Sequence, residues 1–395
     1  MTHPAPTPVQ IALILAIASL TVMANATISP SLPGLAEAFS DTPNIQTLAG
    51  LVLSLPSLAI VLTAALFGVL LDRVSWKRML TAALVFYGFG GAAAALMDSM
   101  MGILASRLVL GLGVAATMTT VSMLAAQLFE GPARDRFMGW QAGAMSAGGV
   151  VFILMGGALA EIDWRAPFLA YLAALPLAAA MAVVFRSLPA RFAQTAGEAG
   201  DASRLPRADL ALGMSLGFMS MAIFYLIPTK LPFHLLSLGV TSPTLMAAAV
   251  AGVTLSATPG ALFFGALRAR FGSTLIFAFS FAAMSLGYVT IGYSNGFGMA
   301  LAGTILAGTG LGPMMPNIMA VLMSRMPPAL RGRAAGLATT SFFAGQFAAP
   351  LLAGALTEPF GLAGVFGIYG AALMVFAALS VAATVLWRPT RARNV

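Results

Sequence analysis

The amino-acid sequence predicts an all-helical integral membrane protein whose transmembrane helices form two repeated bundles. Three observations predict this fold: the hydrophobic composition, the distribution of basic residues and an internal repeat. Of the 395 residues, 59% are hydrophobic and only 8% are charged, whereas about 25% of the residues in soluble domains are charged. A soluble core of this size cannot bury so much apolar sequence, so the excess must face lipid.

The apolar stretches are long enough to cross a membrane many times. A helix needs about 20 mainly apolar residues to span a bilayer, and the sequence contains twelve such runs. No basic region precedes the first run and hydrophobic runs follow it throughout the chain, so we expect it to be a retained helix and not a signal peptide. The runs cover roughly residues 9–29, 45–71, 79–97, 101–128, 137–160, 167–186, 209–229, 244–267, 274–294, 298–324, 334–357 and 362–387.

The basic residues predict the orientation, because cytoplasmic loops carry an excess of Lys and Arg. With both termini in the cytoplasm, the loops after the even-numbered runs and the C-terminal tail hold 17 of the 20 basic residues: Arg73, Lys77, Arg78, Arg134, Arg136, Arg186, Arg191, Arg204, Arg207, Arg268, Arg270, Arg325, Arg331, Arg333, Arg388, Arg391 and Arg393. The opposite loops hold Glu37, Asp41, Asp98, Glu161, Asp163 and Glu358. This asymmetry predicts an even number of spans, and it explains the net charge of +8 without a nucleic-acid partner.

The chain divides into two similar halves. Residues 187–208 form the only long polar segment, so we expect a cytoplasmic linker between six-helix bundles at 1–186 and 209–395. Duplicated halves in one orientation are typical of transporters whose substrate site lies at the midplane between them. A shift of 197 residues superimposes Gly68 on Gly265, Arg73 on Arg270, Gly111 and Gly113 on Gly308 and Gly310, Arg134 and Arg136 on Arg331 and Arg333, and Gly139, Gly148 and Gly157 on Gly336, Gly345 and Gly354.

Several classes of function are disfavoured. The sequence has no cysteine and only two histidines, His3 and His234, so we expect no thiolate or histidine metal site and no cofactor. An intramembrane enzyme would need a nucleophile with its base, or metal ligands, inside the bilayer, and the runs contain no such set. An ATP-driven pump would need a phosphate-binding loop, and the sequence contains no such motif. The duplicated halves disfavour a channel. The expected partners are a small-molecule substrate and the bilayer, with the chain acting as a monomer.

A motif at the end of the second run carries a family resemblance. Residues 68–78, Gly-Val-Leu-Leu-Asp-Arg-Val-Ser-Trp-Lys-Arg, resemble the loop 2–3 signature of the major facilitator superfamily, G-x-L-x-D-R-x-G-x-K-R. The resemblance implies a conformational latch. Its carboxylate would meet the N-terminal end of the eleventh span near Gly336, where the helix dipole favours an anion, only when the cytoplasmic side is closed. The matching residues are Gly68, Leu70, Asp72, Arg73, Lys77 and Arg78, and Ser75 stands where the family has glycine.

The nearest branch resembles the twelve-span drug:proton antiporters. Residues 107–113, Arg-Leu-Val-Leu-Gly-Leu-Gly, resemble the signature of their fourth span. Their fifth-span signature, G-x8-G-x3-G-P-x2-G-G, is kept at Gly139, Gly148, Gly156 and Gly157, but residues 152–153 are Phe-Ile instead of Gly-Pro. This resemblance implies a secondary-active exporter of small amphiphilic molecules, driven by protons in a bacterial inner membrane. The alternative is an importer of a small nutrient or metabolite.

Arg107 is the only basic residue within a confident run. Intramembrane charges are functional candidates by default, so we expect it to bind an anionic group of the substrate or to take part in proton coupling. The alternative is snorkelling towards the outer end of the fourth span. Because all twelve acidic residues lie in loops or at the ends of runs, a cavity with Arg107 and no acid is expected to favour neutral or anionic substrates.

Polar residues in the central spans are candidates for the substrate cavity, although each could instead make a helix–helix hydrogen bond. Lys230 and His234, at the outer end of the seventh span, are expected at the membrane interface, with an outer vestibule as the alternative. Met314, Met315, Phe342 and Phe343 are candidates for a pliable apolar lining. The polar cavity candidates are Asn25, Thr27, Thr117, Thr120, Tyr225, Thr309 and Asn317, with Gln141 in the fifth span and Gln346 in the eleventh.

Overall fold

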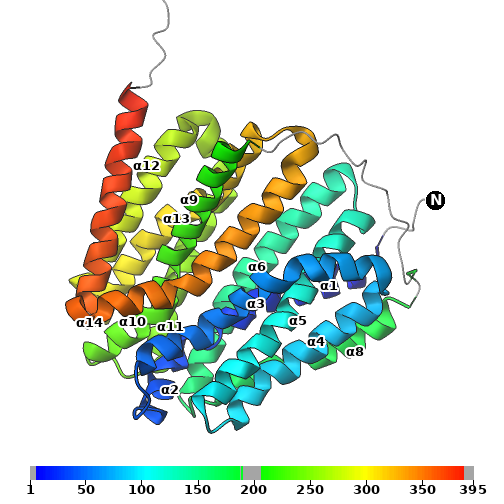
Figure 1. Ribbon diagram of the computed structural model, residues 1–395, viewed down its shortest axis with the longest axis horizontal. Coiled ribbons are helices and arrows are strands. Elements are labelled where there is room, and N and C mark those ends of the chain that lie inside the picture. The colour runs from blue at the N-terminus through cyan, green and yellow to red at the C-terminus, as the bar shows by residue number, and fades with distance from the viewer. Residues whose placement is uncertain (1–5, 187, 190–205, 387–395) are drawn as a thin grey trace, which may run out of the picture.

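The computed structural model describes residues 6–186, 188–189 and 206–386, and every regular element within them is helical (Figure 1). The predicted linker at 187–208 therefore falls largely outside the described residues. The elements in chain order are α1 (Pro8–Ala26), η1 (Ser29–Ser31), α2 (Leu32–Ala38), α3 (Ile45–Arg73), α4 (Trp76–Ala93), η2 (Ala94–Leu96), α5 (Met100–Leu128), α6 (Gly131–Ala160), α7 (Ala166–Leu169), η3 (Ala170–Ala173), α8 (Ala174–Val184), α9 (Arg207–Phe224), α10 (Leu226–Ser237), α11 (Pro243–Leu262), α12 (Phe264–Gly292), α13 (Phe297–Arg325), η4 (Pro328–Leu330) and α14 (Arg331–Leu386).

Eleven helical segments of the described chain are long and apolar enough to cross a membrane. The last of them, Pro328–Ala382, has 55 residues and contains both of the final predicted runs. At about 1.5 Å per residue it is more than twice the thickness of a hydrocarbon core. The backbone of Gly361 within it is non-helical, with φ 66° and ψ 173°. This positive φ favours glycine, and it joins two helices, drawn orange and red in Figure 1, into α14.

The first and seventh spans extend beyond their predicted runs, over Pro8–Ala38 and Arg207–Ser237, and each is broken near the end of its predicted run. α1 ends at Ala26 and the chain continues through η1 into α2, while α9 ends at Phe224 and α10 begins at Leu226. Prolines that follow each break cannot donate a helix hydrogen bond: Pro30 and Pro33 in the first span, and Pro228 and Pro232 in the seventh. The repeated proline pattern in the sequence therefore corresponds to a repeated helix break.

The 197-residue repeat of the sequence is also a repeat of packing. A Cβ added to Gly111 on α5 would meet Pro56 and Ala59 of α3, and one added to Gly308 on α13 would meet Val253 and Ser256 of α11. The residue pairs 59/256 and 111/308 both differ by 197. Close approach of small residues is the usual way in which helices associate within membranes, so the two glycines fix equivalent helix pairs in the two halves.

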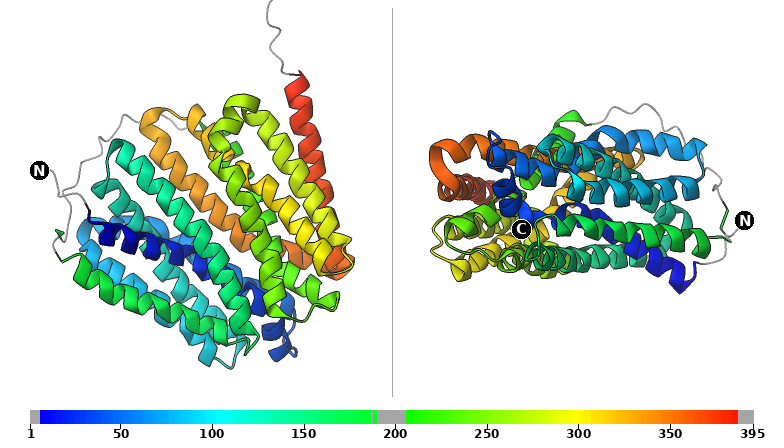
Figure 2. Two further views of the ribbon diagram at one scale, coloured as in Figure 1. Left: turned by 180° about the vertical axis from the view of Figure 1, so that it is seen from behind. Right: turned by 90° about the horizontal axis from the view of Figure 1, so that it is seen from below.

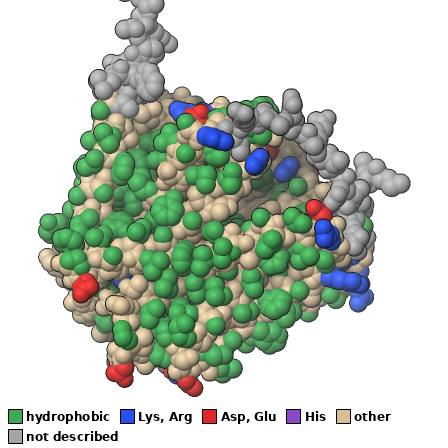
Figure 3. Space-filling view, viewed as in Figure 1, with side chains coloured by type: hydrophobic (Ala, Val, Ile, Leu, Met, Phe, Trp, Pro, Cys, Tyr) green, Lys and Arg blue, Asp and Glu red, His purple; other side chains and the backbone are tan. Residues whose placement is uncertain are grey.

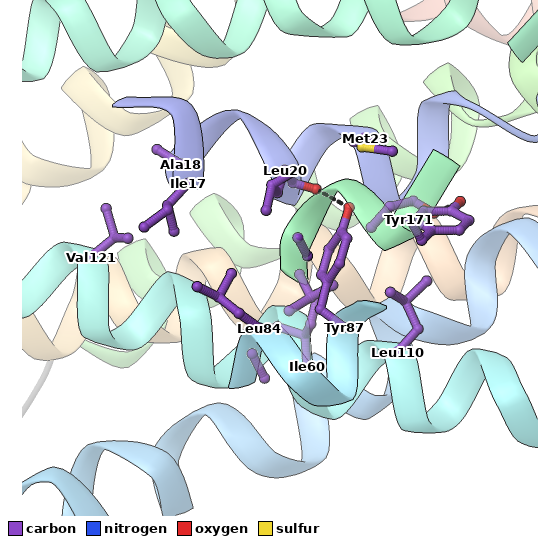
Figure 4. Packing of buried hydrophobic residues seen from close by; sticks show 14 of the residues in the cluster. Ile17, Ala18, Leu20, Met23, Ile60, Leu84, Tyr87, Leu110, Val121 and Tyr171 are labelled. Atoms are coloured by element: carbon purple, nitrogen blue, oxygen red, sulfur yellow. Dashed lines mark hydrogen bonds between the residues drawn. The ribbon is translucent and has the colours of Figure 1, made fainter. Parts of the chain in front are cut away.

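The buried apolar side chains form two large clusters. One is built mainly from residues 13–188 and the other mainly from residues 223–377. Figure 4 shows part of the first cluster, in which the Tyr87 hydroxyl donates to the carbonyl oxygen of Leu20 at 2.6 Å. In the second cluster the Tyr288 hydroxyl donates in the same way to Ile223, at 2.5 Å. In Figures 1 and 2 the blue-to-green helices lie together on one side of the molecule and the green-to-red helices on the other.

The charged side chains gather at two ends of the molecule. We call the end that carries Asp72, Arg134 and Arg325 the basic end, and the opposite end, with Glu37, Glu161 and Glu358, the acidic end. In Figure 3 the visible Lys and Arg side chains lie mainly at the upper and right edge, where some Asp and Glu side chains lie beside them, while the lower and left edge shows Asp and Glu side chains. The bands of helix between the two ends are mainly apolar, as expected for a surface that faces lipid.

Candidate functional site

A cavity of about 240 Å³ lies where the two halves meet. α1, α3, α5 and α6 line it from the first half, and α9, α10, α11 and α14 from the second. The lining residues are Thr21, Val22, Asn25, Ala26, Leu53, Met118, Met145, Gly149, Ile153, Met221, Phe224, Tyr225, Ile227, Pro228, Val250, Thr254, Phe343 and Gln346. None of these described residues carries a charge, and most of the surface is aliphatic, aromatic or methionine. Such a lining can adapt to apolar molecules of different shape.

Two hydrogen bonds that involve cavity-lining residues connect the halves. The Asn25 side-chain amide donates to the Tyr225 hydroxyl at 2.9 Å, and the Ser57 hydroxyl donates to Gln346 Oε1 at 2.9 Å. The side-chain oxygen of Asn25, Oδ1, is buried and has no hydrogen-bond partner among the described residues. An unsatisfied acceptor next to an apolar cavity can accept a hydrogen bond from a bound molecule.

The helix breaks explain why Asn25 and Tyr225 meet. Asn25 lies in the last turn of α1, and Tyr225 is the single residue between α9 and α10. Discontinuous helices near the middle of a membrane protein commonly form substrate sites, because irregular backbone there is stable only where it lines a cavity or is covered by protein. The two proline-linked breaks therefore place one polar side chain from each half at the same point.

Three of the nine polar candidates from the sequence, Asn25, Tyr225 and Gln346, line the cavity, and six do not. Most of the six bond to backbone: Thr27 to Met23, Thr120 to Ala116, Thr309 to Leu306 and Asn317 to Ser273. Thr117 is fully buried with its hydroxyl unpaired, and Gln141 is half-buried on α6. Phe343 is the one apolar candidate on the lining, while Met314, Met315 and Phe342 are absent from it.

Much of the cavity lining carries no distinctive signal in the sequence. Thr21, Thr254 and three methionines, Met118, Met145 and Met221, all line the cavity. The chain contains 24 methionines, and none of the three stands in a distinctive motif. Their position depends on how the halves pack, so no local signal in the sequence separates them from methionines that face lipid.

Arg107 is buried within the first half and does not line the cavity. Its guanidinium donates to the carbonyl oxygen of Gly91 at 2.5 Å and lies 4.9 Å from the ring centres of both Phe168 and Tyr171. The expectation that Arg107 gives the cavity a positive charge is therefore not met in this arrangement. The alternative, that its side chain snorkels to the outer end of the span, is not met either. Cation–π contacts and a carbonyl near a helix C-terminus stabilise the guanidinium instead.

Arg107→Ala is expected to destabilise the protein by about 2 kcal/mol or more, because it leaves a cavity beside Phe168 and Tyr171. The ratio of anionic to neutral compounds transported should stay within about twofold of wild type, since the guanidinium does not reach the cavity. Thermal unfolding and transport of matched anionic and neutral probes test this. A selective loss of anionic transport, with normal stability, would instead make Arg107 a substrate-binding residue.

Lys230 and His234 are buried, with 0% and 3% of their surfaces exposed, so the expectation that they lie at the membrane interface was wrong. The physical reason is the break after Tyr225: α10 is a short helix covered on all sides by other helices, and every residue from Leu226 to Leu235 is buried. His234 Nε2 lies 2.9 Å from the Ile291 carbonyl oxygen and 3.1 Å from Ser294 Oγ.

The halves separate towards the basic end. On α6 and α14, Gly157 and Gly354 contact the other half near the acidic end, at Ala247 and Thr47 respectively. Gly143 on α6 and Gly336 on α14 lie nearer the basic end, and a Cβ added to either would meet no described atom within 4 Å. Figure 3 shows a hollow on this side with basic side chains at its rim. The same helix pairs thus touch at one end and diverge at the other.

The proposed latch residues lie at this open end. Asp72 is exposed, and a Cβ added to Gly68 would meet no described atom within 4 Å. Lys77 donates to the carbonyl oxygens of Arg186 and Leu188, at 3.4 and 2.6 Å, just beyond the C-terminus of α8. Arg73 and Arg78 are exposed at the same end. A contact of Asp72 with the helix near Gly336 requires that the basic end be closed, so this arrangement agrees with an open basic end.

A polar contact joins the halves at the acidic end. Glu161, directly after α6, accepts hydrogen bonds from the Ser242 hydroxyl at 2.5 Å and from the Thr244 backbone N–H at 3.1 Å. Ser242 is the N-cap of α11, so the carboxylate lies at the positive end of a helix dipole. These hydrogen bonds hold the pKa of Glu161 below its ordinary value. The sequence marked Glu161 only as an acidic loop residue.

Two bundles of membrane helices with a cavity at their interface define a secondary-transporter architecture. The sequence profile of the Major Facilitator Superfamily matches residues 14–252 and 210–395, so the chain belongs to this superfamily and is a membrane transporter. Among solved structures of the same fold, the D-xylose–proton symporter has a TM-score of 0.77 at 15% identity, with 96% of each chain covered. The nucleoside transporter NupG has a TM-score of 0.71 at 14% identity, covering 93% of this chain and 98% of its own.

Curated relatives include drug-efflux proteins. The chain is 30% identical over 162 residues to the multidrug resistance protein MdtG of Rahnella sp. (strain Y9602). That match covers 40% of this chain and 39% of the relative, so the chain spans about two fifths of the first curated relatives it matches. The class C tetracycline resistance protein of Escherichia coli is 26% identical over 325 residues, 78% of this chain and 80% of its own. The chain is thus a multi-pass protein of a bacterial inner membrane with efflux relatives.

Proposed function

We propose that this transporter is a secondary-active exporter of small amphiphilic molecules, works by alternating access and is driven by proton entry. The observation that carries the proposal is the uncharged cavity at the interface between the halves, which favours apolar molecules with a few hydrogen-bonding groups. Because Arg107 lies away from this cavity, neutral substrates fit better than anionic ones. The names of the MdtG and tetracycline resistance relatives support export over import.

The proposed topology has twelve spans, the final two joined at Gly361 within α14, and both termini in the cytoplasm. The excess of basic residues at the basic end supports a cytoplasmic location for that end. The bundles at 1–186 and 209–395 would rock against each other as rigid bodies within a monomer. The cavity would then open alternately to the cytoplasm, as in the arrangement described here, and to the outside, when Asp72 meets the start of α14 near Gly336.

Transport into inside-out vesicles with an acidified lumen tests the function. A panel of cationic, neutral and anionic fluorescent compounds is offered, with and without an uncoupler. We expect uncoupler-sensitive accumulation of neutral amphiphiles in vesicles that contain the protein, and none in vesicles without it. Accumulation of lipophilic cations alone would contradict the argument from the uncharged cavity, and uptake in the opposite direction would identify an importer.

Asn25→Asp is expected to change the charge selectivity of the cavity. The substitution keeps the shape of the side chain and places a carboxyl group where Oδ1 has no partner. Transport of lipophilic cations should rise by about tenfold or more relative to neutral compounds, because an opposite charge in a poorly hydrated cavity attracts them. Asn25→Leu is the control, since it removes the polar group without adding a charge. If both variants admit cations equally, charge does not set the selectivity.

A further inference from the structure

Lys230 is a buried basic residue that the proposed cavity does not explain. Its side chain is fully buried in α10, and its Nζ has no hydrogen-bond partner among the described residues. One turn further along, His234 is also buried but bonds to Ile291 and Ser294, and Arg107 bonds to Gly91. Burial of an ammonium group without a partner is costly, and ionisable residues inside membrane proteins usually have a function.

Among the described residues, no carboxylate compensates the charge of Lys230. α10 packs against η1, α2, α3, α9, α11, α13 and α14, and it contacts α12 through the hydrogen bond between His234 and Ile291. Within these elements, η1 and α11 have no ionisable residue. The carboxylates of the others are exposed or lie in an ion pair at a helix end, as Asp209 does with Arg325. The ionisable groups on these elements are Glu37, Asp72, Arg73, Arg207, Asp209, Arg268, Arg270, Tyr288, Arg325, Arg331, Arg333, Glu358 and Tyr369, together with Tyr225 and His234 beside and on α10 itself.

Lys230 lies within the closed contact between the halves. Pro228, two residues before it, accepts a hydrogen bond to its carbonyl oxygen from the Ser29 hydroxyl of η1 at 2.6 Å. Thr229, directly before it, lies against Gly50 of α3, whose added Cβ would be 3.7 Å from Thr229 Cβ. Opening of the acidic end must separate α10 from η1 and α3. The surroundings of Lys230 therefore change between the two conformations of the cycle. Lys230 is also close to the cavity, because the lining residues Ile227 and Pro228 lie on the same helix within one turn of it.

We propose that the amine of Lys230 is the proton-binding site that couples transport to the proton gradient. The proposal rests on the proposed function, in which protons drive export. When the acidic end is open, water reaches α10 and Nζ takes up a proton from that side to become an ammonium group. When the end closes, the ammonium group loses its hydration and gains no partner, so the proton leaves towards the cavity and the basic end. One proton enters and one leaves in each cycle, and no other bond changes.

Purified full-length protein in liposomes tests the proposal with a neutral fluorescent amphiphile as the probe. Lys230→Met should lose uncoupler-sensitive accumulation by about tenfold or more, but should keep probe exchange at equal pH within about twofold, because only the coupling between proton and substrate is removed. Lys230→Arg should lose accumulation in the same way, since a guanidinium does not release its proton. His234→Gln, a buried and partnered position on the same helix, is the matched control and should keep both activities.

The outcomes separate this proposal from the proposed function. Accumulation that persists in Lys230→Met overturns the role of Lys230 and leaves the exporter intact. Loss of exchange together with accumulation in a folded variant overturns it as well, because Lys230 is then needed for substrate binding or movement. Wild-type exchange without gradient-driven accumulation removes proton coupling and this proposal with it. Absence of all exchange in wild type contradicts only the proposed class of substrate. A conformational reporter then tests whether Lys230 binds the coupling proton.

The reporter uses the absence of native cysteine. Ala49 of α3 is fully buried and directly precedes Gly50, which lies against Thr229 and Pro350 of the other half, so we expect Ala49→Cys to react with a thiol reagent only when that end opens. Labelling should increase as the pH falls, because proton binding to Lys230 favours the open acidic end, and this increase should disappear when Lys230→Met is added. Labelling that depends on pH equally in both proteins, or in neither, overturns the proposal without any measurement of transport.

Discussion

Gly156→Ala is expected to separate α6 from α1 and to abolish transport. A methyl group at Gly156 would overlap the carbonyl group of Thr27, which is backbone and cannot rotate away. Overpacking of a close helix contact costs about 1–3 kcal/mol, and here the displaced backbone is the break that positions Asn25. The midpoint of thermal unfolding and the yield of monodisperse protein should both fall, and neutral-probe transport should be lost even in the protein that folds.

Gly139→Ala on the same helix is the matched control. A Cβ at Gly139 would meet no described atom within 4 Å, and alanine favours the helix by about 1 kcal/mol over glycine. This variant should therefore be as stable as wild type or more so. Equal behaviour of the two variants would mean that α6 and α1 tolerate a wider separation than the structure has. Both glycines belong to the antiporter-like signature, yet only one of them lies in close contact.

Glu161→Gln is expected to shift the protein towards an open acidic end. The carboxylate holds Ser242 and the N-terminus of α11 from the other half, and an amide loses the charge that interacts with the helix dipole. Labelling of Ala49→Cys should increase several-fold in this variant, because a change in the relative stability of two conformations changes their populations directly. Ser242→Ala should act in the same direction with a smaller effect, since the Thr244 backbone donor remains.

The pH dependence of this contact follows from the lowered pKa of Glu161. A carboxyl group whose pKa is lower when the contact is made favours that contact at pH values above its ordinary pKa, and the contribution is lost as the pH falls through the lowered pKa. The contact should therefore persist through mildly acidic pH. Glu358→Gln, an exposed carboxylate at the same end without a described partner, should leave labelling unchanged. A larger effect at Glu358 than at Glu161 would show that net charge, not this contact, holds the end closed.

Arg107 and Lys230 show why local patterns do not assign roles to charged residues. Arg107 was a candidate functional residue because it lies inside a hydrophobic run. In the structure, Gly91, Phe168 and Tyr171 contact its guanidinium and hold it in the interior of the first half. Lys230 lies near the end of a run, where snorkelling is the usual behaviour. The break after Tyr225 moves it into the protein interior. The distance of a residue from the end of a run predicts its depth only when the helix is continuous and faces lipid.

The sequence by itself determined that this is a helical membrane protein with two repeated halves. The composition, the apolar runs of about 20 residues and the 197-residue repeat of glycines carry that information. Lipid requires long apolar helices, and helix packing requires small residues at fixed positions. The prolines that accompany the breaks of the first and seventh spans are visible in the sequence as well. Asn25 and Tyr225 were candidates because they are polar residues within the first and seventh spans.

Only the tertiary structure decided which residues meet across the two halves. Met145, Met221 and Gln346 line one cavity because the bundles pack against each other near the acidic end and diverge towards the basic end. That packing depends on contacts between residues up to about 290 positions apart, such as Ser57 with Gln346. Local periodicity fixes which residues form a helix, but the relative placement of two separately packed bundles is set by long-range contacts that no local pattern records.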